Sequence, residues 1–256
     1  MLFPTKQSPC DKETASAKTK SASQRHVHIE NYCKITQTMQ TKTRIIPLGD
    51  SSVLVHFGSE IDISINQRVH ALANLVETSS LAGVIETVPA YATLLVQYDP
   101  LVLSFTQVRD FLGEKLSQVE ETVSRKPKWV EVPVRYGGEY GIDLDAVARH
   151  HQLQVEDVIR IHTQRTYTVY MMGFTPGFPY MGRLDDALVM PRLETPRTRV
   201  PAGTVAIAGS QTGIYPIASP GGWRLIGWTP LKLFNPNSET PFLFVPGNEV
   251  KFVEEK

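Results

Sequence analysis

The chain has 256 residues, of which 41 % are hydrophobic and 20 % charged, and its 26 Lys and Arg residues balance 26 Asp and Glu residues. This is ordinary globular composition, and the lack of a basic excess argues against a general binder of nucleic acids or acidic membranes. No uninterrupted apolar stretch approaches the roughly 20 residues that span a bilayer. We therefore expect neither a nucleic-acid nor a membrane partner.

Cysteine and histidine usage limits the chemistry that is available. Both cysteines, Cys10 and Cys33, precede residue 34, so the later chain offers no thiol nucleophile, disulfide or Cys-rich zinc site. The pairs His150-His151 and His26-x-His28 have no accompanying ligand cluster, so we expect no metal site. Together with the lack of a secretory signal pattern, this indicates a reducing cytoplasm.

Residues 1–40 differ in composition from everything that follows. They are rich in Lys, Ser, Thr and Gln, they show no helical or strand period, and they contain a second methionine, Met39. We interpret them as a disordered extension or a misplaced start. A transit peptide is a weaker alternative, because acidic residues interrupt what should be an acid-poor helix.

A hairpin and a helix open the patterned region. The runs 44–48 and 53–57 are strand-like and are separated by a short Gly49-Asp50-Ser51-Ser52 turn. Ser64 and Gln67 have the spacing of a capping box, so we expect a helix to begin at Ser64. Its apolar face recurs at helical spacing: Ile65, Val69, Leu72 and Val76.

A second strand pair and a second helix repeat this order. Strands are predicted near 84–89 and 92–98, and a helix over about 104–118. The predicted buried residues of that helix are Val108, Phe111, Leu112 and Leu116. The pattern predicts an N-terminal α+β domain over residues 41–125, with both helices on one face of an antiparallel sheet.

The polar stretch from Glu120 to Lys128 predicts a linker, and a second domain is predicted over residues 128–256. It opens with the alternating valines Val130, Val132 and Val134. Two short helices follow, at about 143–151 and 155–163, the first capped by Asp143. Short strand-like runs separated by Gly and Pro then continue to the end, which is typical of an all-β barrel or sandwich.

The common catalytic motifs are absent from the sequence. There is no G-x-x-x-x-G-K-[ST] phosphate loop, no G-x-G-x-x-G after a strand, no H-E-x-x-H and no G-x-S-x-G. If the chain binds ATP, it does so without a standard phosphate loop.

The run 172–182 is the first candidate for a binding surface. Its glycines and prolines fix a tight irregular backbone, and its aromatic rings supply flat surfaces. The alternative is a buried turn that caps the barrel, and locally the two readings are equally well supported. The candidate substrate- or nucleotide-binding residues in this run are Thr175, Gly177, Phe178 and Tyr180.

Arginines and glycines gather after residue 195. Arg197 and Arg199 alternate, which places both guanidinium groups on one face of an extended strand, where they suit a carboxylate or a phosphate. The alternative is a solvated strand face. The glycine-rich runs that follow contain the polar side chains of Gln211, Tyr215 and Arg224. Together with the two arginines, these residues predict a pocket.

His162 is a candidate proton-transfer group with a simpler alternative. It falls on the apolar face of the helix predicted at 155–163, in register with Val155, Val158 and Ile159. A packed histidine with satisfied hydrogen bonds is the default at such a position, and a general base is the second reading.

Several motifs of the chain resemble those of one bacterial family. They are Val132-Pro133-Val134-x-Tyr136-Gly137-Gly138, Gly173-Phe174-x-Pro176-Gly177-Phe178-Pro179-Tyr180, Thr195 to Gly203, Gln211 to Pro216 and Ser219 to Gly227. Over about residues 42–255 the chain is similar to the family of 5-oxoprolinase B subunits. That family has also been called allophanate hydrolase subunit 1, and it includes the Bacillus sporulation-kinase inhibitor.

The resemblance implies an N-terminal α+β domain followed by a cyclophilin-like β-barrel. It also implies an enzyme subunit that is inactive alone and works with the A and C subunits of 5-oxoprolinase. Such complexes convert 5-oxo-L-proline to L-glutamate with ATP as co-substrate, together with Mg²⁺, and phosphorylate the lactam before hydrolysis. We expect Arg197, Arg199, Gln211 and Arg224 to line a site at the boundary with the C subunit, with His162 as a secondary candidate.

Two other functions are compatible with the same motifs. One is an inhibitor that binds a sensor histidine kinase, because the family includes such a protein. The other is a subunit of an allophanate hydrolase or urea carboxylase system, although the chain contains no biotin-attachment segment. The identity of the partner distinguishes the three functions.

Overall fold

The structure is a computed structural model that describes residues 43–119 and 128–255. The predicted extension over residues 1–40 lies outside the described residues. The predicted linker also lies outside them, apart from Lys128 at its end. The first described part is a sheet with helices, and the second is a barrel.

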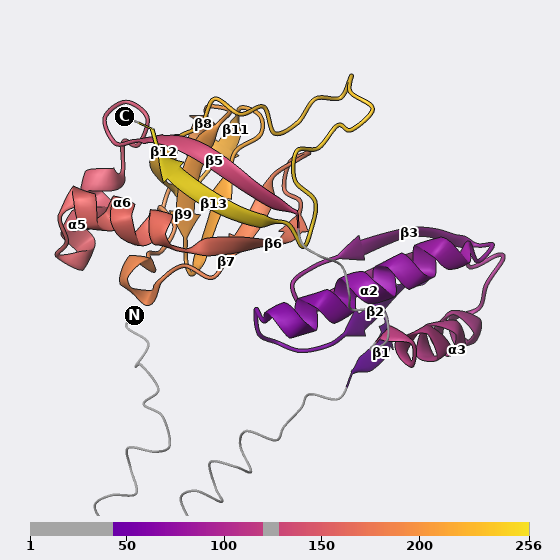
Figure 1. Cartoon of the computed structure of the whole chain (residues 1–256). Helices are drawn as coiled ribbons and strands as arrows, with labels where there is room; N and C mark the ends of the chain where they lie inside the picture. The colour runs from indigo at the N-terminus through magenta and orange to yellow at the C-terminus, as the bar shows by residue number, and fades with distance from the viewer. Residues whose placement is uncertain (1–42, 120–127, 256) are drawn as a thin grey trace, which may run out of the picture. The chain divides into compact units, whose positions relative to one another are not determined.

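The first part is an antiparallel sheet in the strand order β1-β2-β4-β3 (Figure 1). Its strands are β1 (Arg44–Pro47), β2 (Ser52–His56), β3 (Val84–Pro89) and β4 (Thr93–Tyr98). Helices α2 (Ile63–Ser79) and α3 (Phe105–Leu116) pack on one face of this sheet. The predicted α+β fold is confirmed.

Alternation along the strands places the core of this sheet on one face. Val53 and Val55 of β2 and Leu94 and Val96 of β4 are fully buried, whereas their immediate neighbours are partly exposed. The helix residues in the same core include the predicted Val69, Leu72, Val76, Val108 and Leu112. Phe111 and Leu116 are only partly buried, at the edge of this core.

The predicted start of the first helix was wrong. Asp62 is the N-cap of α2, and its carboxylate accepts hydrogen bonds from the Ile65 amide at 3.0 Å and from the Ser64 hydroxyl at 2.5 Å. Ser64 lies inside the helix, so it does not form a capping box with Gln67. An aspartate at the N-cap accepts a hydrogen bond from a backbone amide of the first helical turn, just as a serine does. Here the hydroxyl of Ser64 donates a second hydrogen bond to the same carboxylate.

The second part is a closed barrel with the strand order β10-β7-β6-β13-β5-β12-β9 (Figure 1). Its strands are β5 (Trp129–Tyr136), β6 (Thr166–Met172), β7 (Pro179–Gly182), β9 (Thr204–Ala208), β10 (Gln211–Ile214), β12 (Arg224–Trp228) and β13 (Glu249–Glu254). Neighbours in the barrel are antiparallel except β5 and β13, which run parallel. The spacing of Gly and Pro left a barrel or a sandwich open, and the structure is the closed barrel that the resemblance implies.

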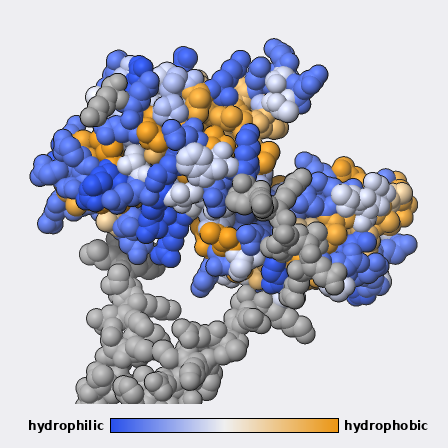
Figure 2. All heavy atoms as spheres, viewed as in Figure 1, coloured by the Kyte–Doolittle hydropathy of each residue, from blue (hydrophilic) through white to orange (hydrophobic). Residues whose placement is uncertain are grey.

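Short elements are added to the barrel. Strands β8 (Arg197–Val200) and β11 (Ser219–Gly221) form a separate two-stranded sheet. Helices α5 (Leu144–His151) and α6 (Val155–Gln164) lie side by side at one end of the barrel, and η2 (Asp186–Leu188) is a single 3-10 turn. Hydrophilic residues cover most of the surface around α5 and α6 (Figure 2), because their apolar faces point into the barrel core.

The barrel domain has an inner and an outer apolar cluster. Every barrel strand contributes to the inner one, which includes Val134, Val169, Met181, Ile207, Ile214, Ile226 and Phe252. The alternate residues of β9 and β12, Ala206, Ala208 and Leu225, belong to the outer cluster, together with Val200 of β8. Side chains fill the barrel interior, so ligands are expected on its outer surface.

Within the part of the chain that the structure describes, none of the helices has the length and apolarity to cross a membrane.

Candidate functional site

Five aromatic side chains from the sequence motifs meet on the outer face of the barrel. The ring of Phe178 is central, and its centroid lies 4.8 Å from Tyr180, 5.2 Å from Tyr215, 5.4 Å from Trp223 and 5.7 Å from Phe174. Most of these pairs are tilted or edge-to-face, the arrangement that aromatic quadrupoles favour. We call these five residues the aromatic cluster. It brings together the predicted candidates Phe178, Tyr180 and Tyr215.

Glycines of the same motifs make room for these rings. A Cβ atom on Gly213 would lie 2.9 Å from the Phe178 ring, and one on Gly221 would lie in the Tyr215 side chain. Gly177 has a φ of +85°, a conformation that other residues rarely adopt. These glycines therefore have structural roles, and the chain's own rings occupy the space beside two of them.

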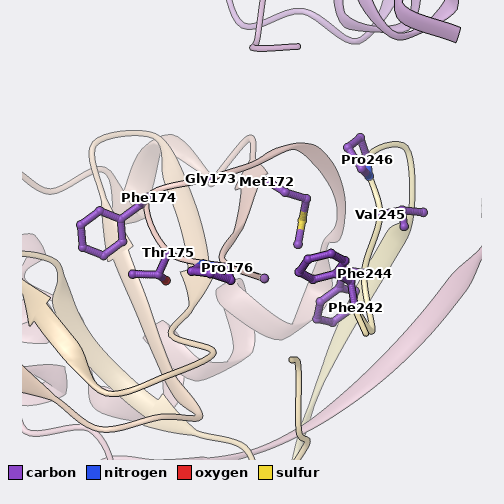
Figure 3. Close-up of a pocket in the computed structure, with 10 residues that line it drawn as sticks. Met172, Gly173, Phe174, Thr175, Pro176, Phe242, Phe244, Val245 and Pro246 are labelled. Atoms are coloured by element: carbon purple, nitrogen blue, oxygen red, sulfur yellow. The ribbon is translucent and has the colours of Figure 1, made fainter. Parts of the chain in front are cut away.

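An apolar pocket of about 430 Å³ lies beside the cluster. Its walls are the run 172–177 and the segment with Phe242, Phe244, Val245 and Pro246. Figure 3 shows Thr175 and Pro176 among the side chains that line the pocket, whereas the ring of Phe174 points away from the other side chains. The Thr175 hydroxyl is buried and has no hydrogen-bond partner in the described structure. The predicted candidates Thr175 and Gly177 thus line an apolar pocket, which suits an apolar group better than a phosphate.

Arg197 is held by a carboxylate of the same chain. Its Nη2 lies 2.8 Å from Oδ1 of Asp143, and its Nη1 donates to the carbonyl of Trp223 at 3.5 Å. The other oxygen of Asp143 accepts from the Leu225 amide at 2.7 Å. Asp143 is the N-cap residue of α5, as predicted, but its side chain makes no capping hydrogen bond. Its carboxylate instead binds β8 and β12.

The predicted pairing of Arg197 with Arg199 fails because β8 contains a bulge. Val200 pairs with Ser219 and Arg197 with Gly221, so three steps along β8 match two along β11. An extra residue breaks the alternation that would place both arginines on one face. Arg197 is half-buried against Asp143, whereas Arg199 is exposed and makes no ion pair within the described residues.

Arg224 and Gln211 occupy different strands near the cluster. Arg224 begins β12, directly after Trp223, and its Nε donates to the carbonyl of Pro191 at 3.3 Å. Gln211 begins β10, on the same strand face as Gly213, and pairs with Gly182 of β7. Arg197 thus contacts the backbone of Trp223, Arg224 pairs across the sheet with Ile207 of the inner cluster, and Gln211 lies on the outer face.

The sequence motifs missed Arg192. Its guanidinium carbon lies 5.8 Å from the centroid of the Trp223 ring, a cation–π contact, and the side chain is exposed. Arg192 precedes the motif that begins at Thr195, and no local pattern marks it. Only the fold shows that residues 191–193 run beside Gly222: the Leu193 amide donates to the carbonyl of Gly222 at 2.7 Å.

His162 lies in the barrel core, fully buried. Its Nδ1 is 2.7 Å from the Tyr136 hydroxyl, and its Nε2 is 3.0 Å from Oγ1 of Thr212. Thr212 also donates to the carbonyl of Ala206, so its oxygen accepts from Nε2–H while Nδ1 accepts from Tyr136. Burial lowers the pKa of His162 to about 3. A neutral, enclosed imidazole fits the first interpretation, a packed histidine whose hydrogen bonds are satisfied. We therefore assign no proton-transfer role to His162.

The outer face offers groups that suit an anion. Arg192 and the Tyr180 hydroxyl can donate to phosphate or carboxylate oxygens. Among residues 43–119 and 128–255 no three His, Cys, Asp or Glu side chains converge as a metal site would require. Magnesium that arrives with ATP commonly keeps phosphate and water ligands, which does not require such a site.

Comparisons with known proteins match nearly all of the described chain. Residues 43–244 match the family model of the carboxyltransferase domain, subdomain C and D. The 5-oxoprolinase B subunit of Bacillus subtilis is 45 % identical over 84 % of this chain and 94 % of its own length. The chain belongs to the family of 5-oxoprolinase B subunits. The Haemophilus influenzae member is 39 % identical over 82 % of this chain and 97 % of its own length.

Solved structures agree with this family assignment. The chain matches TTHA0988 with a TM-score of 0.72 and 40 % identity, over 80 % of this chain but only 40 % of that longer chain. PH0987 from Pyrococcus horikoshii is 49 % identical over 83 % of this chain and 98 % of its own, with a TM-score of 0.50. The Kluyveromyces lactis urea carboxylase, at 21 % identity and a TM-score of 0.66, shares the fold over 84 % of this chain and 22 % of its own.

Proposed function

We propose that the chain is the B subunit of an ATP-dependent 5-oxoprolinase. The observation that carries the proposal is the 45 % identity with the Bacillus subtilis protein of that name, over 94 % of its length. The Haemophilus influenzae and Escherichia coli proteins of the same name match at 39 % and 36 %, each over 97 % of its length. Because these matches cover nearly the full length of each relative, they support similarity to the whole B subunit and not to a single domain of it.

The proposed reaction opens the lactam of 5-oxo-L-proline to give L-glutamate. A lactam carbonyl is a poor electrophile, and transfer of a phosphoryl group from ATP to its oxygen turns that oxygen into a leaving group for hydrolysis. Such a step depends on cationic and hydrogen-bond donors around the phosphoryl group. Gln211 and the Tyr180 hydroxyl are donors on the outer face of the barrel, and Arg224 is a cationic donor that directly follows Trp223 of the aromatic cluster, which is why we place the contribution of this subunit there.

Two arginines take different roles in this proposal. The ion pair with Asp143 and the bond to the Trp223 carbonyl make Arg197 a positioning residue for the β8–β11 sheet and the cluster. Arg199 is exposed on the other side of the bulge, where it can reach a partner subunit. The relatives are named as one subunit of an enzyme, which implies a complex, and we propose that the A and C subunits complete it.

We further propose that the subunit is inactive alone and acts in the cytoplasm. The relatives are named as one subunit of an enzyme, so we expect other subunits to supply groups for hydrolysis. A reaction that consumes ATP fits the cytoplasm, where ATP is regenerated.

Reconstitution tests the proposed function. The full chain is assayed alone and after co-purification with candidate A and C subunits, by ATP turnover and glutamate formation with and without 5-oxo-L-proline. We expect glutamate only from the full mixture, with ATP turnover stimulated by 5-oxo-L-proline. Arg224→Ala should lower this activity by about tenfold or more, the loss typical when a charged hydrogen bond is removed.

Other outcomes would overturn the proposal. Glutamate-free ATP turnover in the full mixture, or no complex with the A and C subunits, would exclude a 5-oxoprolinase subunit. Tight binding of the isolated chain to a histidine kinase, with loss of kinase autophosphorylation, would assign the chain to the inhibitory branch instead.

A further inference from the structure

The first sheet carries a continuous row of aliphatic side chains that crosses all four of its strands. One residue from each strand takes part in the register: Ile46 pairs with Leu54, Leu54 with Leu95, and Leu95 with Val88. Residues that are directly paired across two strands point to the same face of a sheet. The four side chains are therefore neighbours on one face. We call these four residues the aliphatic row.

The aliphatic row lies on the face opposite α2 and α3. Val55 and Leu94, the chain neighbours of Leu54 and Leu95, are fully buried in the core with the two helices. Because successive residues of a strand point to opposite faces, the row points away from that core. Ile46 and Val88 are 39 % and 44 % exposed, and the two central leucines are partly exposed. Such a contiguous apolar surface is typical of an interaction face.

Ionisable groups of opposite sign flank the aliphatic row. The register aligns Arg44, His56 and Thr93 on one side of the row, and Ser52, Gln97 and Glu86 on the other. Each of these residues is two positions from a member of the row and therefore shares its face. Arg44 and Glu86 are exposed, and the ion pairs of the described chain include neither of them. One flank thus offers basic groups and the other an acidic group.

Arg44 and Glu86 occupy opposite corners of this face. Arg44 lies on the edge strand β1 and Glu86 on the other edge strand, β3, with the aliphatic row between them. Consider a second copy turned over onto the face about a two-fold axis that lies between the sheets, perpendicular to the line that joins these corners. Arg44 of each copy then faces Glu86 of the other, and the two aliphatic rows cross at Leu54 and Leu95. The strands cross at nearly a right angle, which is one of the two common packings of sheets.

We propose that this face binds the same face of a second copy, so that the chain forms a symmetric dimer. A symmetric dimer needs a self-complementary surface, and the face combines an apolar centre with opposite charges at opposite corners. The apolar centre excludes water on contact, and the two pairs of Arg44 with Glu86 set the orientation. The dimer does not depend on the proposed reaction, whose candidate residues lie on the barrel.

The size of the face predicts a weak dimer. Four strands of about five residues cover an area of about 20 Å by 20 Å. A contact of this size is small for a specific interface, so we expect a dissociation constant on the order of micromolar. Sedimentation equilibrium of the full chain should therefore show monomers at low concentration and dimers at high concentration.

Val88→Asp tests the apolar part of the contact. Val88 is exposed on an edge strand, so the fold tolerates the change, whereas the dimer would have to bury a carboxylate. Association should weaken by about tenfold or more. The matched control is Val253→Asp in β13, because Val253 is also a partly exposed strand valine, at 37 %. The control should leave the dissociation constant unchanged.

Charge reversal tests the arrangement of the two copies. Arg44→Glu and Glu86→Lys each place like charges opposite one another in the dimer, so each variant alone should associate about tenfold more weakly or worse. An equal mixture of the two variants restores opposite charges at both contacts, and it should recover the association of the unmodified chain as a mixed dimer. Arg109→Glu, on α3, reverses another exposed arginine and should have no effect.

Three outcomes would overturn the proposal. The first is an unmodified chain that stays monomeric at every concentration. The second is a dimer that resists Val88→Asp and both charge reversals, because the contact would then lie elsewhere. The third is a mixture of the two charge variants that fails to associate. If the chain alone is monomeric and Val88→Asp abolishes binding of another subunit, the face belongs to that subunit and not to a second copy.

Discussion

Gly213 shows how one missing side chain supports the aromatic cluster. A Cβ at this position would lie 2.9 Å from the Phe178 ring and 3.0 Å from the carbonyl of Pro179. Both neighbours are buried, so neither can move away freely. The glycine therefore acts on the site indirectly, through the ring that occupies its space.

We expect Gly213→Ala to lower the free energy of unfolding by about 1–3 kcal/mol, because overpacking forces the ring or the backbone to shift. Urea unfolding followed by circular dichroism measures the change. The control is Gly113→Ala in α3, where a Cβ meets nothing within 4 Å and helix propensity favours alanine by about 0.5–1 kcal/mol. Equal stability of Gly213→Ala and the unmodified chain would contradict the packing argument.

The buried imidazole of His162 gives a pH-dependent contribution to stability. Burial lowers its pKa from 6.5 to about 3. Between these values the unfolded chain binds a proton that the folded chain excludes, so acidification favours unfolding. This contribution is complete above pH 6.5 and is lost as the pH falls toward 3, with a slope of up to about 1.4 kcal/mol per pH unit.

His162→Gln should therefore lose less stability between pH 7 and pH 5 than the unmodified chain. Glutamine can hydrogen-bond Tyr136 and Thr212 but does not titrate. Urea unfolding at the two pH values gives the comparison. His70 and His151, whose pKa values are also lowered mainly by burial, are present in both proteins and cancel. Parallel losses in the two proteins would show that His162 is not the titrating group.

At the scale of elements, Asp143 connects three pieces of the barrel domain. It lies at the start of α5, its carboxylate pairs with Arg197 of β8, and the same carboxylate accepts from the Leu225 amide of β12. The side chains of Asp143 and Arg197 are 9 % and 26 % exposed, so water screens this pair less than a surface pair.

Asp143→Ala should lower the free energy of unfolding by about 2 kcal/mol, because it leaves a half-buried guanidinium and a buried amide without their acceptor. Thermal or urea unfolding measures the loss, and the Leu225 amide should exchange its hydrogen faster. Asp110→Ala, which breaks the exposed pair with Arg109, should cost at most about 1 kcal/mol. A larger loss in Asp110→Ala than in Asp143→Ala would refute the role given to Asp143.

Most elements could be predicted from the sequence because their signals are local. Alternating valines in β5 and the helical spacing of Val69, Leu72 and Val76 depend only on neighbouring residues. The site was predicted less well because its contacts are not local. The bulge that separates Arg197 from Arg199 arises from pairing with β11, and the place of Arg192 depends on a strand that follows much later.

Two apolar cores organise the described parts of the whole molecule. One belongs to the sheet with α2 and α3, and the other fills the barrel beneath α5 and α6. The proposed site uses neither core: it lies on the outer cluster of the barrel. Substitutions at the exposed residues of this surface should therefore affect the stability of the fold less than substitutions in either core.

Removal of residues 1–42 should leave folding and partner binding intact. The family match begins at residue 43, and the elements of both cores follow that residue. The shortened chain should show an unchanged midpoint of urea unfolding, and it should co-purify with the A and C subunits as the full chain does. Loss of the complex after this truncation would assign a binding role to residues 1–42.

Strand β13 closes the barrel, because it pairs with β5 on one side and with β6 on the other. It follows every other barrel strand in the chain, so a ribosome releases it last of all the barrel strands. During translation the sheet with α2 and α3 can fold early, whereas the barrel stays open, with β5 and β6 unpaired along one edge, until residue 254 has emerged. Nascent chains that stall before this point would expose two strand edges to aggregation, and such truncated products would need chaperones.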